Sequence, residues 1–137
     1  MRFLSVLVIL AFTCVAKAEW EVTDGNSLAR GMALVKRAQA SGVLTADEKN
    51  TALSTVNYLR GFLGSSSLWS RIDKASPFKF PQDGIPTIQL EKVVDKYFAN
   101  HPEKLHESAD FLVYLALMES FPNPVFKKAL EDQSPSD

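Results

Sequence analysis

The 137-residue chain is almost free of cysteine, and its one cysteine, Cys14, lies inside an apolar N-terminal segment. Without that segment the chain has no disulfide framework, no thiol nucleophile and no cysteine metal site. It also lacks a charge excess, because 15 basic and 16 acidic residues leave a net charge of -1. Phosphate binding needs an excess of Lys and Arg, so the composition excludes a basic nucleic-acid-binding protein.

Long apolar stretches are absent except at the N-terminus. Arg2 precedes the almost wholly apolar stretch Phe3–Ala16, and Ala18 completes a small-x-small signal peptidase site. This pattern predicts a signal peptide, residues 1–18, cleaved before Glu19. The stretch is shorter than the ~20 residues that a membrane-spanning helix needs. An uncleaved anchor and a lipoprotein modified at Cys14 are the alternatives.

The predicted mature chain, residues 19–137, has 13 basic and 16 acidic residues, a net charge of -3. Apolar residues recur in it at helical spacing, and no convincing alternating strands occur. The sequence therefore predicts one all-α domain, a compact bundle of four main helices plus short extra helices. Residues 131–137 read as a loose polar tail. The main helices are predicted at about Ser27–Ala38, Thr45–Leu63, Thr87–Ala99 and Ala109–Ser120, with short ones near 68–74 and 125–130.

Local signals refine these helices. Asn26 or Ser27 is expected to cap the first helix, and Thr45 with Glu48 forms a capping box for the second. In the second helix, Gly61 suggests close packing by another backbone, and Gly64 suits a left-handed cap. The residues expected on the core face of the second helix are Leu53, Val56, Leu59 and Leu63.

Motifs for catalysis are missing. His101 and His106 are five residues apart with Pro102 between them, whereas zinc-protease helices place two histidines four apart. We expect this segment to be a turn between two helices, with histidine side chains bonding exposed backbone ends. The chain has no Gly-rich phosphate loop and no Gly-x-Ser-x-Gly elbow. We therefore predict no catalytic residue, no metal and no cofactor.

The segment Ser65–Arg71 is the strongest candidate for binding. It follows the predicted second helix, and it combines small polar residues with Trp and Arg, two types enriched at binding hot spots. The alternative places Trp69 in the core and Arg71 on an idle surface. The predicted partner-binding residues are Ser65, Ser66, Leu68, Trp69 and Arg71.

Two stretches of the chain resemble a known family. They are Tyr58–Gly64 and Val93–His106, the latter followed by Phe121-Pro122. Over about Leu28 to Pro124 the chain resembles the Rap/Tai immunity proteins of bacterial type VI secretion systems. The resemblance implies a periplasmic antitoxin, commonly a homodimer, that binds a peptidoglycan amidase effector and blocks its active-site cleft. It implies fold-keeping roles for six matched residues, which are Gly61, His101, Pro102, His106, Phe121 and Pro122.

One feature departs from that family. Many members carry a cysteine between the two prolines that follow the fourth helix, and a second one in the preceding long loop. Here Asn123 takes the first place, with Lys79 or Phe80 in the second, so the disulfide that such a pair would form is absent. We expect aromatic side chains to offset its loss by packing that loop onto the last helix. They are Phe78, Phe80, Phe121 and Phe126.

The leading hypothesis is inhibition by occlusion, in which a loop at Ser65–Arg71 fills an amidase cleft and Trp69 and Arg71 anchor it. The first rival is a periplasmic chaperone or envelope interaction protein without a dedicated toxin. The second rival is a small hydrolase or ligand-binding module, which no residue pattern in the sequence supports.

Overall fold

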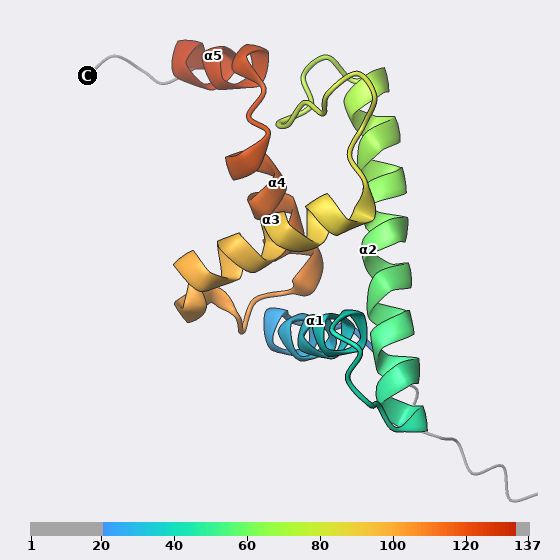
Figure 1. Cartoon of the computed structure of the whole chain (residues 1–137). Coiled ribbons are helices and arrows are strands. Elements are labelled where there is room, and N and C mark those ends of the chain that lie inside the picture. The colour runs from blue at the N-terminus through green and yellow to red at the C-terminus, as the bar shows by residue number, and fades with distance from the viewer. Residues whose placement is uncertain (1–20, 134–137) are drawn as a thin grey trace, which may run out of the picture.

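The computed structural model describes residues 21–133, which form five α-helices and one 3₁₀ turn (Figure 1). The all-α prediction of four main helices with short extra ones is confirmed. The predicted signal peptide and residues 134–137 lie outside the described residues. The elements are α1 (Gly25–Gln39), α2 (Ala46–Ile72), α3 (Thr87–Asn100), η1 (Pro102–Lys104), α4 (Ala109–Ser120) and α5 (Pro124–Gln133).

The ends of α1, α2, α3 and α5 differ from the sequence prediction. Helix α3 has Pro86 at its N-cap, with Thr87 as its first residue. Helix α5 begins at Pro124, a favoured first helical residue because proline lacks the N–H that a helix start leaves unpaired. It continues through Gln133, so residues 131–133 are helical rather than part of a loose tail.

Helix α1 begins two residues earlier than expected, because Asp24 rather than Asn26 or Ser27 is its N-cap. The Ser27 amide donates to Asp24 Oδ1 at 2.8 Å, and the Asp24 amide donates to Ser27 Oγ at 3.1 Å. These two bonds form a capping box that pairs the free donors of the first turn. The hydrogen bond from the Ser27 amide, followed by that from its hydroxyl, lowers the pKa of Asp24.

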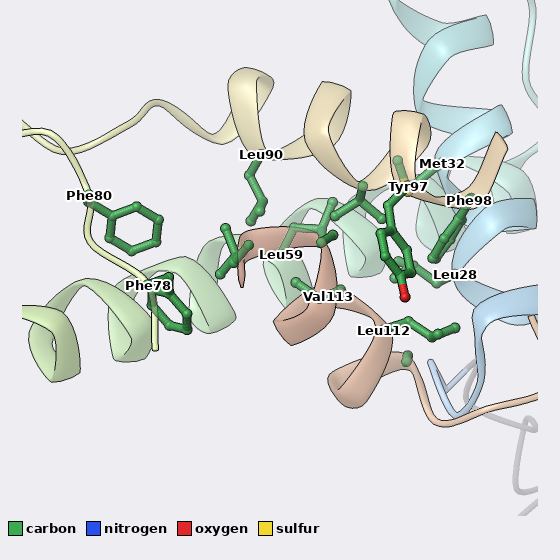
Figure 2. Close-up of a cluster of buried hydrophobic side chains, with 14 residues drawn as sticks. Leu28, Met32, Leu59, Phe78, Phe80, Leu90, Tyr97, Phe98, Leu112 and Val113 are labelled. Carbon is green, nitrogen blue, oxygen red and sulfur yellow. The ribbon is translucent and has the colours of Figure 1, made fainter. Parts of the chain in front are cut away.

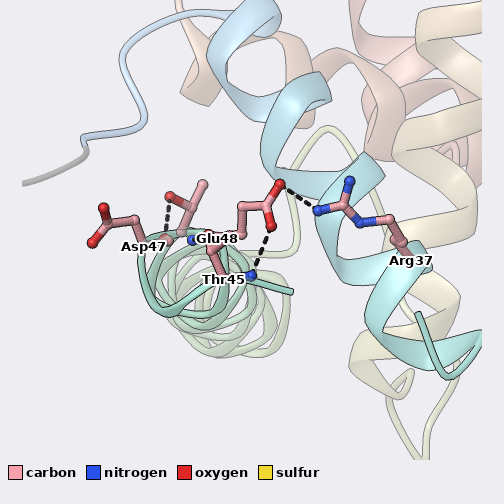
Figure 3. Close-up of polar contacts among 5 residues, drawn as sticks. Arg37, Thr45, Asp47 and Glu48 are labelled. Atoms are coloured by element: carbon pink, nitrogen blue, oxygen red, sulfur yellow. Dashed lines mark hydrogen bonds and ion pairs between the residues drawn. The ribbon is translucent and has the colours of Figure 1, made fainter. Parts of the chain in front are cut away.

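The capping box predicted at the start of α2 is confirmed (Figure 3). The Thr45 amide donates to Glu48 Oε2 at 2.8 Å, and the Glu48 amide donates to Thr45 Oγ1 at 3.3 Å. The other Glu48 oxygen forms a salt bridge with Arg37 of α1. The bond from the Thr45 amide, followed by that from Arg37, lowers the pKa of Glu48. This carboxylate therefore joins the cap of α2 to the end of α1.

The core lies where α1, α3 and α4 meet one side of α2, and Figure 1 shows the opposite side of α2 open. Helix α4 is apolar on most of its surface and supplies more buried residues to this core than any other helix. Figure 2 shows how side chains from all four helices interlock. Those with no exposed surface are Leu28, Leu59, Leu90, Val94, Leu112, Val113, Ala116 and Leu117.

The predicted core face of α2 is wrong at Leu53, whose side chain is 61% exposed. Ala52 and Thr55 are buried in its place. Ala52 packs in a second cluster with Val35 and Leu44, where α1 approaches α2. Small residues let the two helices come close, so this contact and not the leucine spacing decides which face of α2 points inward.

The start of α1 is docked on the loop that precedes α4. The Gly25 amide donates to the Glu107 carbonyl at 3.0 Å, and the Asn26 amide donates to the Leu105 carbonyl at 2.9 Å. A Cβ at Gly25 would stand 2.9 Å from that Leu105 oxygen, so only glycine permits this approach. The loop carbonyls of Leu105 and Glu107 therefore have hydrogen-bond partners, although the loop has no regular secondary structure there.

A polar contact also joins α2 to α4. The Tyr58 hydroxyl donates to Asp110 Oδ1 at 2.5 Å. Partial burial, followed by this bond to the carboxylate, raises the pKa of Tyr58. The phenol therefore stays protonated and keeps donating to Asp110 over the physiological pH range. Among residues 21–133, no helix is long and apolar enough to cross a membrane.

The two capping carboxylates predict acid sensitivity. Their folded pKa values lie below the ordinary 3.8 of Asp24 and 4.5 of Glu48. Their stabilisation is therefore complete above about pH 5 and is lost as pH falls through the folded pKa values. We expect the melting temperature of Glu48→Gln, measured by circular dichroism, to fall less than that of wild type between pH 6 and pH 3. Glu131→Gln on α5 is the control, and equal acid sensitivity of all three proteins would contradict this origin.

Candidate functional site

The segment predicted to be a binding loop is the last two turns of α2. The helix continues through Ile72, so no loop protrudes at Ser65–Arg71. The serines misled the prediction, because their hydroxyls here bond within the helix: Ser65 Oγ donates to the Phe62 carbonyl at 2.9 Å, and Ser70 Oγ donates to the Ser67 carbonyl at 3.1 Å. Such bonds make serine compatible with a helix, and no proline follows until Pro77.

The helix separates the two predicted anchors. Residues two apart on an α-helix point about 200° away from each other. Trp69 and Arg71 therefore emerge on opposite sides of α2, and they line different depressions. Leu68 is 61% exposed and lines neither of them. The five candidate residues thus belong to three faces of one helix rather than to one loop.

Trp69 stands over an apolar depression, here called the Trp69 hollow. It has a volume of about 270 Å³, and its lining residues are Ser65, Ser66, Trp69, Phe78 and Tyr114. Trp69 is 59% exposed, which contradicts the alternative that placed it in the core. The rings of Phe78 and Tyr114 meet edge to face, with centroids 5.7 Å apart. The hollow therefore combines a fixed aromatic floor with an exposed indole.

Arg71 borders a larger depression, here called the Arg71 groove. It has a volume of about 520 Å³, and its lining residues are Ser67, Ser70, Arg71, Lys79, Phe80, Pro81 and Gln82. Helix α2 forms one wall, and the loop that returns from α2 forms the other. Most of its side chains carry polar groups, whereas the Trp69 hollow is lined mainly by apolar ones.

The third face of α2 is a stripe of small and apolar residues, here called the outer stripe. A Cβ at Gly61 or Gly64 would have no atom of residues 21–133 within 4 Å. The close packing expected at Gly61 is therefore absent among these described residues, and Gly64 lies inside the helix rather than in a left-handed cap. The residues of the outer stripe are Leu53, Gly61, Gly64, Leu68 and Ile72, all of them exposed.

Comparison with known proteins identifies the family. Residues 30–123 match the family model of the Rap1a immunity proteins, which is well over half of the chain. The chain belongs to the Rap1a immunity protein family. No curated protein and no solved structure matched it. Membership implies that this Rap1a-family protein protects against a secreted effector and that a partner protein is its ligand.

In this Rap1a-family protein, the side chain of His101 contacts other side chains of the same chain. The His101 ring packs on Tyr97 with centroids 4.4 Å apart, and its nitrogens face Glu119 at 3.3 Å and Glu103 at 3.6 Å. The expected bonds to exposed backbone ends are wrong, because the ring meets carboxylates instead. Pro102 begins η1, and His106 is exposed. No metal-binding group of three or more acidic, His or Cys side chains occurs among the described residues.

The loop after α2 is held against the end of α4 without a disulfide, by backbone hydrogen bonds and aromatic rings. Phe78 pairs with Pro122 in an antiparallel bridge, and the Lys79 amide donates to the Phe121 carbonyl at 2.9 Å. The Phe80 ring lies 5.5 Å from Phe121 and 5.3 Å from Phe78, centroid to centroid. The expected aromatic packing is therefore confirmed for these three rings. It positions Phe78 in the Trp69 hollow and Lys79 in the Arg71 groove.

Asn123 adds a hydrogen-bonded clamp to this packing. The residue is 5% exposed, and its side-chain amide donates to the Ser76 carbonyl at 2.6 Å and the Lys74 carbonyl at 3.1 Å. Its Oδ1 accepts from the Val125 amide at 3.1 Å and so caps α5. Three such bonds together contribute about 2–4 kcal/mol, similar to the ~2–4 kcal/mol of a disulfide.

The clamp makes a prediction for stability. Asn123→Ala should lower the melting temperature by about 5–15 °C, because it leaves the buried Ser76 carbonyl and the partly buried Lys74 carbonyl without this donor. Asn123→Asp separates the two roles, since aspartate caps a helix well but cannot donate to those carbonyls. We expect it to be destabilised nearly as much as the alanine variant. Asn57→Ala, exposed on α2, is the control, and an Asn123→Asp variant as stable as wild type would reduce Asn123 to a helix cap.

Proposed function

We propose that this protein is a periplasmic immunity protein that binds a peptidoglycan amidase effector of a type VI secretion system and covers its active site. Membership of the Rap1a immunity family supports a secreted effector as the partner. The apolar N-terminal stretch that ends at Ala18 supports export. The observation that carries the proposal is the exposed Trp69 beside an aromatic hollow, on a helix that the core holds rigid.

The Trp69 hollow has the physical properties of a binding hot spot. Trp is among the residues that contribute most at protein interfaces, and a hot-spot side chain contributes about 2 kcal/mol or more. Because Trp69 stands on a packed helix rather than on a loop, little backbone conformational entropy is lost on binding. Ser65 and Ser66 line the hollow without bulk, which leaves room for a partner side chain against Phe78 and Tyr114.

We also propose that the protein is a homodimer through the outer stripe. Gly61 and Gly64 allow a second helix to come close, and Leu68 and Ile72 supply exposed apolar surface beside them. Leu68 is 61% exposed and Ile72 is 75% exposed, and burying such apolar surface against a second copy is favourable. At about 100° per residue, Leu68 and Ile72 lie between Trp69 and Arg71 around α2, so a second copy and an effector compete for the last turns of the helix.

Light scattering of the mature chain tests the dimer. We expect twice the monomer mass for wild type, and the monomer mass for Gly61→Arg, because a charged side chain cannot enter a close helix contact. The variant should fold, since the space around Gly61 is open within the chain and Arg favours helix more than Gly. Gln89→Arg on α3 adds the same charge elsewhere and should stay dimeric. A monomeric wild type would reject the dimer.

Capture and inhibition test the proposed function. Tagged mature protein would be used to capture proteins from periplasmic and secreted fractions of its own and neighbouring strains under stringent salt. We expect one dominant amidase, whose hydrolysis of peptidoglycan falls to zero at an equimolar ratio. Many weak clients without a dominant amidase would favour the chaperone alternative. An amidase that stays active in the saturated complex would reject occlusion.

Variants then test the Trp69 hollow with that amidase. Trp69→Ala should weaken binding by about 30-fold, the loss of ~2 kcal/mol expected for a hot-spot Trp, and leave the helical circular dichroism unchanged. Val43→Ala is the control, because Val43 is 94% exposed and precedes the opposite end of α2. Trp69→Ala binding as tightly as wild type would exclude the hollow from the interface.

A further inference from the structure

The Arg71 groove has the composition of an anion site. Its polar side chains are a guanidinium, an ammonium, an amide and two hydroxyls, from Arg71, Lys79, Gln82, Ser67 and Ser70. The Ser70 hydroxyl already donates to the Ser67 carbonyl, and the other four groups can donate to a ligand. Among residues 21–133, no carboxylate lines the groove. The floor is Phe80, which is 8% exposed and fixed by its contact with Phe121.

In the described part of the chain, the two cations of the groove have no ion-pair partner. Elsewhere in the described part of the chain, Lys36 pairs with Asp95 at 2.5 Å, and Arg37 pairs with Glu48. Within residues 21–133 neither Arg71 nor Lys79 forms a salt bridge, although the predicted mature chain carries a net negative charge. A positive groove without an internal counter-charge attracts an acidic partner.

We infer that the Arg71 groove binds an acidic polypeptide segment of the effector, and this inference rests on the proposed function. The groove and the Trp69 hollow lie on opposite sides of the same two turns of α2. A partner whose cleft closes around the end of α2 reaches both of them at once. One wall of that cleft meets Trp69, and the other presents carboxylates to Arg71 and Lys79.

The chemistry of the groove favours carboxylate side chains carried on a chain. The Arg71 guanidinium can bind a carboxylate with two parallel hydrogen bonds, and Lys79 adds a charge from the facing loop. The groove is open and about 520 Å³ in volume, which suits several residues of an extended segment. Pockets for small molecules usually enclose the ligand and carry few polar groups, whereas five of the seven side chains that line this groove carry one.

Short peptides test the groove without the effector. The mature protein labelled with ¹⁵N would be titrated with acetyl-tetraglutamate amide, acetyl-tetraglutamine amide and inorganic phosphate. We expect the glutamate peptide alone to shift the backbone amides of Ser67, Ser70, Lys79 and Gln82. Equal shifts with the glutamine peptide would reject charge recognition. Shifts as large with phosphate at the same charge concentration would reject a polypeptide ligand in favour of a simple anion site.

Charge reversal tests the groove in the complex. Arg71→Glu with Lys79→Glu should slow association with the captured amidase about tenfold and flatten its dependence on salt. Both side chains are exposed, so the fold should be unaffected. Lys92→Glu with Lys96→Glu, two exposed positions one turn apart on α3, is the matched control. A slowdown equal to that of the control would overturn the inference.

The two proposals can fail separately. If no amidase is captured, the proposed function fails, and the peptide titration still decides whether the groove recognises carboxylates. If the amidase binds and Trp69→Ala weakens it while the charge-reversed variant binds normally, the proposed function stands and the groove is excluded from the interface.

Discussion

The hydrogen bonds of Asn123 hold the candidate site together. Its amide joins the loop after α2 to the junction of α4 and α5, where a single buried side chain meets the backbone at Lys74, Ser76 and Val125. Both depressions on α2 need this loop, because Phe78 closes one and Lys79 closes the other. A small domain without cysteine in its predicted mature chain has to position such a loop with packing and hydrogen bonds alone.

Helix α2 gives the site its shape. Its first half is covered by α1 and its middle by α3, while its last turns carry exposed side chains on three faces. A continuous helix presents each face at a fixed angle, which a loop cannot do without losing entropy on binding. One helix can therefore offer an apolar hollow, a basic groove and a stripe of small residues to different partners or to different parts of one partner.

Much of the fold could be predicted from the sequence. The burial of Leu28, Leu90 and Leu112 follows from apolar residues at helical spacing, and the cap at Thr45 follows from the Glu three residues later. Leu53 is the position at which the core face of α2 was predicted wrongly. Leu53 has the right spacing for the core, yet α1 packs against Ala52 and turns Leu53 outward. Periodicity alone cannot show which neighbour a helix meets.

The candidate site was predictable in its residues but not in its geometry. Trp and Arg in a serine-rich segment indicate binding, and Trp69 and Arg71 are indeed exposed. They lie on opposite sides of α2 because the helix continues past Gly64. The serines after Gly64 are compatible with a helix, because the Ser65 and Ser70 hydroxyls donate to carbonyls of the preceding turn. No local pattern identifies Lys79 or Tyr114 as their neighbours, because these come from a distant loop and from α4.

The all-α class, the approximate helices, the family and the absence of cysteine from the predicted mature chain can all be read from the amino-acid sequence. These properties depend on residue type and on spacing within a few turns, which the chain carries locally. The folded structure is needed to see that Asn123 clamps the long loop, that Gly61 has no neighbour among residues 21–133, and that two depressions flank the end of α2. Each of these results depends on contacts between residues far apart in the chain, which local pattern cannot encode.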